Sequence, residues 1–333
     1  MNNSTLKQLL LEYSRKRNKE IVEANIKKEK IYQENPRLQE IDDELSKFSI
    51  QTAKSILQTN DRSLLDTLKS KKEYLLNEKN EIYNSLNIDS TYFYPQFECN
   101  LCKDTGYIMD NNYKTQMCSC LKQKLLNISY NKSNMTNLSK ENFENFNQNI
   151  FSNEISTNFN ISPKQNILNI KQKCIEFVNN FDNPNSKNLL FTGNTGLGKT
   201  YMSNCIANEL IKKGKNVLYQ TAPVLLETII DNKFNKYKTA NKDNFYKDVL
   251  EADLLIIDDL GTECLNSMKL SELFTILNTR ILNLNNKVTK TIISTNLNIN
   301  NIFKSYEERI GSRIVGYYDI YYFFGEDLRF KRK

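Results

Sequence analysis

Apolar side chains recur at steps of three and four residues through the first quarter of the chain, the spacing of one helix face. The sequence "ENP" at 34–36 ends one such stripe, and Pro36 suits the first position of the next helix. A polar break at 59–63 separates the second stripe from a third that reaches residue 87. The other faces are densely charged, so we expect residues 1–90 to form a helical region that packs as a small bundle or docks on a partner.

From about residue 167 the pattern changes to short apolar runs separated by helix-like segments. The runs are "NLLFT" (188–192), "NVLYQT" (216–221), "LLIID" (254–258) and "TIISTN" (291–296). Strands that alternate with helices predict a parallel sheet, so we expect an α/β domain over residues 167–333. The preceding residues 126–166 are rich in Asn and Ser, and we expect a linker there with short ordered pieces.

A phosphate-binding motif follows the first of these runs. "GNTGLGKT" at 193–200 fits the pattern G-x-x-x-x-G-K-[ST] between an expected strand and an expected helix, which is the context that the motif requires. Backbone N–H groups of such a loop surround phosphate oxygens, the Lys199 ammonium reaches the β- and γ-phosphates, and the Thr200 hydroxyl ligates Mg²⁺. We expect ATP to bind to the whole loop: Gly193, Asn194, Thr195, Gly196, Leu197, Gly198, Lys199 and Thr200.

Two carboxylates follow directly on another apolar run, in "LLIIDDLG" at 254–261. A carboxylate at the carboxyl end of such a strand lies beside the phosphate loop, so we expect Asp258 to hold Mg²⁺ together with Thr200. Asp259 can then orient or deprotonate an attacking water molecule. Asn296 ends the next apolar run, and its side chain can reach the terminal phosphate or that water.

Four cysteines lie close together at 99–120, with the spacing C-x₂-C, fifteen residues, then C-x-C. Two close pairs of reduced thiols are typical of a tetrahedral Zn²⁺ site. The expected ligands are Cys99, Cys102, Cys118 and Cys120. Four thiolates leave no open position on the metal, so this zinc module, residues 91–125, should be structural. A dithiol redox site is the alternative interpretation.

Composition narrows the chemistry further. The chain contains no histidine, which excludes Ser-His-Asp triads, Cys-His pairs and His-ligated catalytic metals. No run of 18 apolar residues is present, and the first residues lack the pattern of a signal peptide, so we expect a cytoplasmic protein with no membrane partner. The net charge of +7 is compatible with a polyanionic partner, although a lysine-rich solvated surface explains it equally well.

In order and spacing, the motifs resemble those of AAA+ ATPases and, more narrowly, bacterial replicative-helicase loaders of the DnaC/DnaI type, which belong with the IstB-like ATP-binding proteins. The matching sequences are "GNTGLGKT", "YQTAPVLLE", "LLIIDDLG", "STN" and "ERIGSRIVG…FFGEDLR". The resemblance covers nearly the whole chain, including the cysteine cluster and the helical first region. It implies an AAA+ P-loop parallel sheet with flanking helices. One departure is Asp259, where many AAA+ proteins have Glu, although loaders of this kind often have two Asp residues.

The resemblance also implies roles for residues outside the loop. Asn296 would be a sensor of the nucleotide's terminal phosphate. Arg313 would be the arginine finger that acts on a neighbouring copy's nucleotide, with Arg309 as the second candidate. Arg329 would be a sensor for the chain's own nucleotide. Our expected catalytic residues are Asp259, Asn296, Arg313 and Arg329.

The function implied by the resemblance is ATP-dependent loading of a replicative DnaB-type DNA helicase onto single-stranded DNA, by copies that assemble in an ATP-bound ring or spiral. Two other functions remain open: a transposition-helper ATPase of the IstB type, and an adaptor that binds ATP without hydrolysing it. The helical region 1–90 would bind the helicase. Measured ATP turnover separates the adaptor from the motor.

A basic segment after the second expected strand is the candidate DNA contact. Lysines can pair with phosphates, and aromatic faces can stack on unpaired bases. The expected DNA-binding residues are Lys233, Lys236, Tyr237 and Lys238. The alternative is a solvated helix end whose aromatic side chains pack inward.

Overall fold

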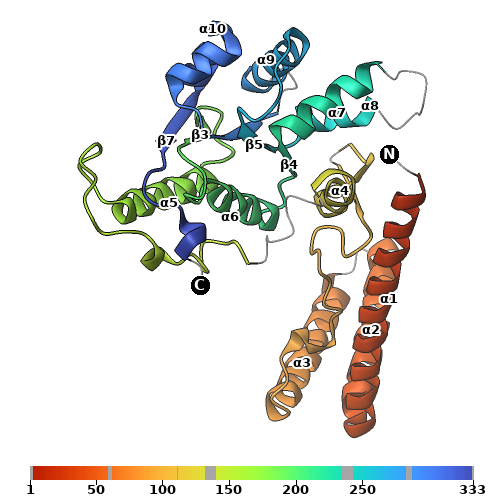
Figure 1. The fold of residues 1–333 in the computed structure, drawn as a ribbon. Helices are drawn as coiled ribbons and strands as arrows, with labels where there is room; N and C mark the ends of the chain where they lie inside the picture. The colour runs from red at the N-terminus through yellow and green to blue at the C-terminus, as the bar shows by residue number, and fades with distance from the viewer. Residues whose placement is uncertain are drawn as a thin grey trace. The chain divides into compact units, whose positions relative to one another are not determined.

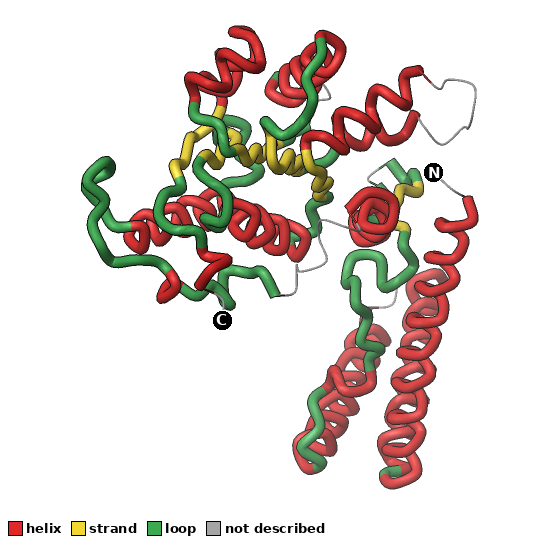
Figure 2. Tube along the Cα trace, in the orientation of Figure 1, coloured by secondary structure: helices red, strands yellow, loops and turns green. Residues whose placement is uncertain are grey.

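The computed structural model describes residues 3–58, 62–110, 112–131, 140–234, 243–282 and 287–331 (Figure 1). Contacts between Cα atoms divide the chain into two compact units. One comprises residues 8–114, and the other comprises residues 115–333 together with the N-terminal end of the first helix. Helices predominate, and most strand residues belong to a single sheet (Figure 2). No helix among the described residues is both long and apolar enough to cross a membrane.

The first unit is mainly helical, as the apolar stripes predict. Its helices are α1 (Asn3–Glu34), α2 (Pro36–Gln58), α3 (Arg62–Ser85) and the short η1 (Ser90–Phe93). Pro36 begins α2, where its missing N–H costs no helical hydrogen bond. Leu38 and Ile41 on α2 and Leu75 on α3 are buried where these two helices pack side by side. The Arg37 guanidinium adds an ion pair to Glu78 across the same two helices, at 2.7 Å.

The second unit contains a parallel five-stranded sheet in the order β4-β5-β6-β3-β7. Its strands are β3 (Asn188–Thr192), β4 (Val217–Thr221), β5 (Leu254–Leu260), β6 (Lys290–Thr295) and β7 (Tyr318–Tyr322). Its α-helices are α4 (Ser119–Leu126), α5 (Pro163–Asn179), α6 (Lys199–Lys212), α7 (Ala222–Phe234), α8 (Asp243–Glu251), α9 (Ser267–Ile281) and α10 (Ile299–Tyr317). Shorter helical turns are η2 (Asn127–Asn131), η3 (Gln148–Ile150) and η4 (Leu328–Lys331).

Alternate strand residues enter two separate cores, one on each face of the sheet. Leu189 and Phe191 of β3 pack with apolar residues of α5 and α6, whereas Leu190 packs with those of α7, α8, α9 and α10. Figure 1 shows α5 and α6 on one side of the sheet and α9 and α10 on the other. This arrangement confirms the expected α/β class, because strands covered on both faces read as continuous apolar runs.

The carboxyl ends of the central strands meet, which positions the candidate site. Thr192, the last residue of β3, is opposite Thr295 on β6. On β5 the pairing register with β6 shifts between Ile257 and Leu260. Asp258 and Asp259 occupy this irregularity, and Asp259 has a positive φ of 55°. A bulge of this kind re-aims side chains at the end of a strand.

Side-chain amides cover the outer edge of β4. Gln123 on α4 accepts a hydrogen bond from Val217 N at 2.7 Å and donates to Val217 O at 3.0 Å. Asn131, at the end of η2, donates to Val217 O and accepts from Tyr219 N, both at 2.9 Å. These two amides make the hydrogen bonds to the β4 backbone that a further strand would otherwise make.

Candidate nucleotide-binding site

The loop 193–198 joins β3 to α6 in a shape that only glycine allows at two points. Gly193 and Gly196 both have positive φ values, 144° and 75°. A Cβ atom at Gly193 would lie 2.1 Å from the carbonyl oxygen of Phe323, and one at Gly196 would lie 1.8 Å from Asp327 Oδ1. The phosphate loop is therefore packed against residues near the C-terminal end of the sheet unit, and Leu328 N donates to Gly196 O at 2.9 Å.

Lys199 opens α6 and turns back into this loop. Its Nζ donates to the carbonyl oxygens of Gly193 at 2.6 Å and Asn194 at 2.7 Å. The side chain is buried, and this burial lowers the pKa of the Lys199 ammonium, while the nearby carboxylates oppose the shift. The ammonium thus lies under the loop, where it would face an anion bound by the loop's N–H groups.

Asp258 is the centre of a buried hydrogen-bond network at the end of β5. Thr200 Oγ1 donates to Asp258 Oδ2 at 3.1 Å, and the Tyr219 hydroxyl donates to the same oxygen at 2.5 Å. The Ser294 hydroxyl on β6 donates to Asp258 Oδ1. Burial raises the pKa of Tyr219, so its phenol stays protonated as a donor. The structure therefore brings together Thr200 and Asp258, as expected, and adds Tyr219 and Ser294, which our sequence interpretation missed.

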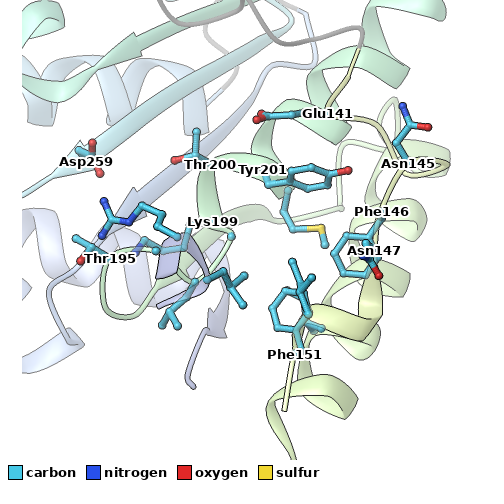
Figure 3. A pocket seen from close by; sticks show the side chains of 18 residues that line it. Glu141, Asn145, Phe146, Asn147, Phe151, Thr195, Lys199, Thr200, Tyr201 and Asp259 are labelled. Atoms are coloured by element: carbon cyan, nitrogen blue, oxygen red, sulfur yellow. The ribbon is translucent and has the colours of Figure 1, made fainter. Parts of the chain in front are cut away.

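Asp259 differs from its neighbour because its side chain points out of the sheet into the cavity. Its backbone N–H donates to Ser294 Oγ at 3.1 Å, which fixes the turn, while the carboxylate stays exposed. Partial burial, and then the charge of Asp258, raise the pKa of Asp259 above its ordinary value. Figure 3 shows Asp259 near Thr200 and Lys199 on one side of the cavity.

Arg329 and Asn296 are two further residues that the sequence predicts for this site. Arg329 lines the cavity, and its guanidinium pairs with Asp327 at 2.6 Å. Asn296 lies beside the loop that follows Asp259, since a Cβ at Gly261 would be 3.4 Å from Asn296 Oδ1.

The two arginine-finger candidates do not line this cavity. Arg309 is exposed, pairs with Glu307 at 2.8 Å and lies over the Phe274 ring, 4.8 Å from its centre. Arg313 lies 5.9 Å from the centre of the Tyr317 ring. Neither arginine is therefore placed to act on the nucleotide site of its own chain.

A wall of the cavity comes from the Asn-rich segment that we expected to be a linker. The cavity has a volume of about 540 Å³. Phe146 and Phe151 face it opposite the phosphate loop (Figure 3). The ring of Phe146 lies 5.8 Å from that of Phe151 and 5.9 Å from that of Tyr201. Asn204 Nδ2 donates to Glu141 Oε2 at 2.6 Å, which ties the segment to α6.

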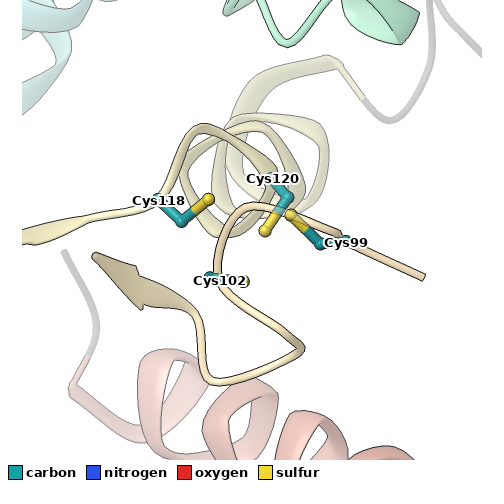
Figure 4. Close-up of side chains that lie close together, drawn as sticks. All are labelled: Cys99, Cys102, Cys118 and Cys120. Atoms are coloured by element: carbon teal, nitrogen blue, oxygen red, sulfur yellow. The ribbon is translucent and has the colours of Figure 1, made fainter. Parts of the chain in front are cut away.

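The four cysteines at 99–120 converge (Figure 4). Their sulfur atoms all lie within 4.8 Å of one another. A tetrahedral Zn²⁺ with Zn–S bonds near 2.3 Å needs S–S separations of roughly 3.8 Å, so the cluster could hold that ion. The Gly106 N–H donates to Cys102 Sγ at 3.4 Å, and the buried Asp104 carboxylate accepts from Cys99 N at 2.9 Å. Strands β1 (Tyr107–Met109) and β2 (Thr115–Met117) pair between the two cysteine pairs.

The expected DNA-binding residues are only partly described. Lys233 lies in the last turn of α7, where its ammonium pairs with Glu272 and lies 5.6 Å from the centre of the Tyr246 ring. These contacts occupy Lys233 within the chain. Lys236, Tyr237 and Lys238 lie outside the described residues.

The fold and the site define the class of this protein: a P-loop α/β protein with a cavity beside its phosphate loop, at the carboxyl edge of its sheet. Residues 125–310, which are 186 of the 333 residues, match the family described as IstB-like ATP binding protein. The chain belongs to this family.

Individual relatives match over shorter stretches. The replicative helicase loader DnaC of Escherichia coli K12 is 30% identical over 96 residues, which are 29% of this chain and 38% of DnaC. The chromosomal replication initiator DnaA of Helicobacter hepaticus is 38% identical over 72 residues, 22% of this chain and 15% of DnaA. A crystal structure of the DnaC helicase loader aligns with a TM-score of 0.42 at 23% identity, over 54% of this chain and 96% of that one.

Proposed function

We propose that this protein hydrolyses ATP with the help of Mg²⁺. The observation that carries the proposal is that Lys199, Thr200 and Asp259 line one cavity, and that Asp258 lies directly behind Thr200, whose hydroxyl donates to it. Thr200 and Asp258 offer a hydroxyl and a carboxylate oxygen, which are ligands that Mg²⁺ prefers. Bound Mg²⁺ would neutralise charge on the phosphates. Lys199 would exchange its two carbonyl partners for oxygens of the β- and γ-phosphates.

In this proposal Asp259 acts on the attacking water. Its exposed carboxylate faces the cavity from the bulge on β5, and its raised pKa improves its strength as a proton acceptor. Arg329 and Asn296 lie at the same edge and would contact the terminal phosphate. The aromatic wall of Phe146 and Phe151 would cover the nucleoside, because its apolar rings suit a purine base better than a phosphate.

We further propose that the ATPase loads a replicative helicase onto single-stranded DNA. The similarity to DnaC over 96 residues supports this role. In this division of labour residues 1–90 bind the helicase, the zinc module 91–125 is a stiff joint, and the ATPase domain contacts DNA. The exposed position of Arg309, away from its own nucleotide site, supports assembly into a ring or spiral in which arginines reach the next copy's nucleotide.

The test is ATP turnover by the full chain alone, with single-stranded DNA, with the host's replicative helicase, and with both. A loader should show turnover that rises several-fold when both partners are present, together with transfer of the helicase onto circular single-stranded DNA. Tight ATP binding without turnover in any mixture would instead identify the non-hydrolysing adaptor. Turnover that responds to duplex DNA and not to helicase would favour the transposition helper. Lys199→Ala protein is the control for contaminating ATPases.

A further inference from the structure

A buried carboxyl–phenol pair joins the loop after β5 to the middle of α10. Glu263 is 9% exposed, and its Oε2 accepts a hydrogen bond from Gly261 N at 2.9 Å. Its Oε1 accepts a hydrogen bond from the hydroxyl of Tyr306, which is fully buried. Burial, followed by this hydrogen bond, raises the pKa of Tyr306, so the phenol keeps the proton that it donates. Neither residue lines the nucleotide cavity, and neither has a part in the chemistry proposed above.

The pair connects two turns that each contain a residue with an unusual backbone conformation. Asp259, two residues before Gly261, has a φ of 55°. Glu307, directly after Tyr306, has φ 65° and ψ 155°, a conformation that few residues other than glycine adopt. Such conformations persist only where surrounding contacts hold them, and they are concentrated at functional sites. The hydrogen bonds of Glu263 connect these two turns directly.

The turn at Tyr306 and Glu307 sets the direction of the segment that carries both finger candidates. These two residues interrupt α10, and residues 308–317 continue as a second helical piece. Glu307 accepts from Arg309 Nε at 2.8 Å, so the turn also contacts the first arginine. A Cβ at Gly311 would lie 2.7 Å from the Phe303 ring, which shows that the two pieces of α10 pack closely.

We propose that Glu263 and Tyr306 are positioning residues, which hold the arginine-bearing segment 308–317 in register with the acidic loop 259–263. In the assembly, this link would hold Arg309 and Arg313 of one copy in position to reach the nucleotide bound by the neighbouring copy. This inference rests on the proposed assembly. Without the Tyr306 hydroxyl, the buried Glu263 carboxyl loses a donor and the turn loses a polar anchor to that loop.

The first test uses two full-length variants that are inactive alone. Lys199→Ala protein has a dead site but can lend its arginines, whereas Arg309→Ala/Arg313→Ala protein has an intact site without arginines to lend. Their mixture should regain turnover. Adding Tyr306→Phe to the arginine donor should lower the turnover of the mixture roughly 10-fold, without changing the acceptor's affinity for ATP. Tyr317→Phe on the same donor is the matched control, because it removes a hydroxyl from an exposed residue of the same helix and keeps the ring beside Arg313. Equal turnover with both donors would overturn the inference.

The second test does not depend on hydrolysis. In the full chain, backbone amides of residues 308–317 should exchange with solvent roughly 10-fold faster in Tyr306→Phe than in Tyr317→Phe protein, while the strands of the sheet stay protected. Glu263→Gln should show the same local effect, and the double variant should add little because both changes break one link. Unchanged exchange in Tyr306→Phe and Glu263→Gln would refute the link itself. If no mixture of variants regains ATP turnover, but amide exchange in residues 308–317 does increase, the proposed assembly is refuted and the link is not.

Discussion

The ammonium of Lys199 is bound by two carbonyl oxygens of its own loop. Those bonds compensate for the burial of a charged group, and they position it below the loop's N–H groups. A phosphate that enters the loop offers the ammonium an ionic partner in place of neutral ones, which strengthens each hydrogen bond. We therefore expect the hydrogen bonds of Lys199 to become stronger when nucleotide binds.

Replacing Lys199 with Ala should weaken ATP binding about 100-fold, because a charge-assisted contact to two phosphates is lost. The dissociation constant can be measured with a fluorescent ATP analogue. Lys212→Ala, an exposed lysine on the same helix paired with Glu209, is the control and should bind ATP normally. Wild-type affinity in Lys199→Ala would contradict the phosphate-loop assignment.

Replacing Asp259 with Asn should abolish turnover and raise the melting temperature at neutral pH. The pKa of Asp259 is raised in the folded protein, first by burial and then by Asp258, so ionising it costs free energy of folding. That cost is absent below the pKa of an unfolded aspartate, about 3.9, and appears as pH rises through the higher folded value. The stability difference between variant and wild type should therefore vanish on acidification. Thermal melts between pH 4 and 8 check this prediction, and an equal difference at all pH values would contradict it.

At the scale of elements, the sequence predicts most of the sheet because its inner strands are buried on both faces. The apolar runs at 188–192 and 254–258 match β3 and most of β5. β7 was not expected, because this edge strand mixes tyrosines with Asp319 and only its first residue is buried. The phosphate loop could be predicted because its chemistry is contiguous in sequence.

The aromatic wall and the Glu263–Tyr306 pair could not be predicted in the same way. Each depends on residues distant in sequence that only the fold brings together; Glu263 and Tyr306, for example, are 43 positions apart. Phe146 and Phe151 gave one local signal, as aromatic residues in an otherwise polar stretch. Hydrophobic periodicity cannot identify such a wall, because the segment is not a regular helix or strand there.

Changing both Phe146 and Phe151 to Ala should weaken ATP binding roughly 30-fold or more, because stacking on a base is worth about 1–3 kcal/mol per aromatic contact and two contacts are lost. The loss should be smaller for inorganic triphosphate, which has no base. Phe159→Ala, on a half-exposed ring stacked with Phe324, is the control. Equal losses for ATP and triphosphate would show that the wall shapes the loop and does not contact the base.

Elemental analysis of freshly reduced protein should find one Zn²⁺ per chain, and Cys102→Ser should reduce this close to zero after mild chelation. The loss should lower the stability of residues 99–120 most, because the metal replaces a core there. ATP binding should persist, since none of the four cysteines lines the nucleotide cavity. Cys264→Ser, at an exposed cysteine, is the control. Metal-free protein with wild-type stability would contradict the zinc assignment.

At the scale of the whole molecule, DNA affinity should depend on lysines beyond the end of α7. Lys236→Ala/Lys238→Ala should weaken binding of the full chain to single-stranded DNA and reduce the slope of log affinity against log salt by about 1.4, as expected for two lost phosphate contacts. Lys27→Ala/Lys30→Ala, on α1, is the control and should leave that slope unchanged. Helicase binding should survive in the Lys236→Ala/Lys238→Ala protein. If the two double variants have the same slope of log affinity against log salt, the DNA contacts lie elsewhere.

The side-chain amides at the edge of β4 should also protect the protein from aggregation while it is being synthesised. An open edge of a parallel sheet can recruit a strand from another molecule, which begins aggregation. Gln123 and Asn131 precede β4 in the chain, so the ribosome releases this cover before the edge that needs it. The residues that cover this edge are therefore already synthesised when β4 emerges. We therefore expect replacement of Gln123 and Asn131 by residues without an amide to increase the share of protein in inclusion bodies. The ATP turnover of the soluble fraction should change little.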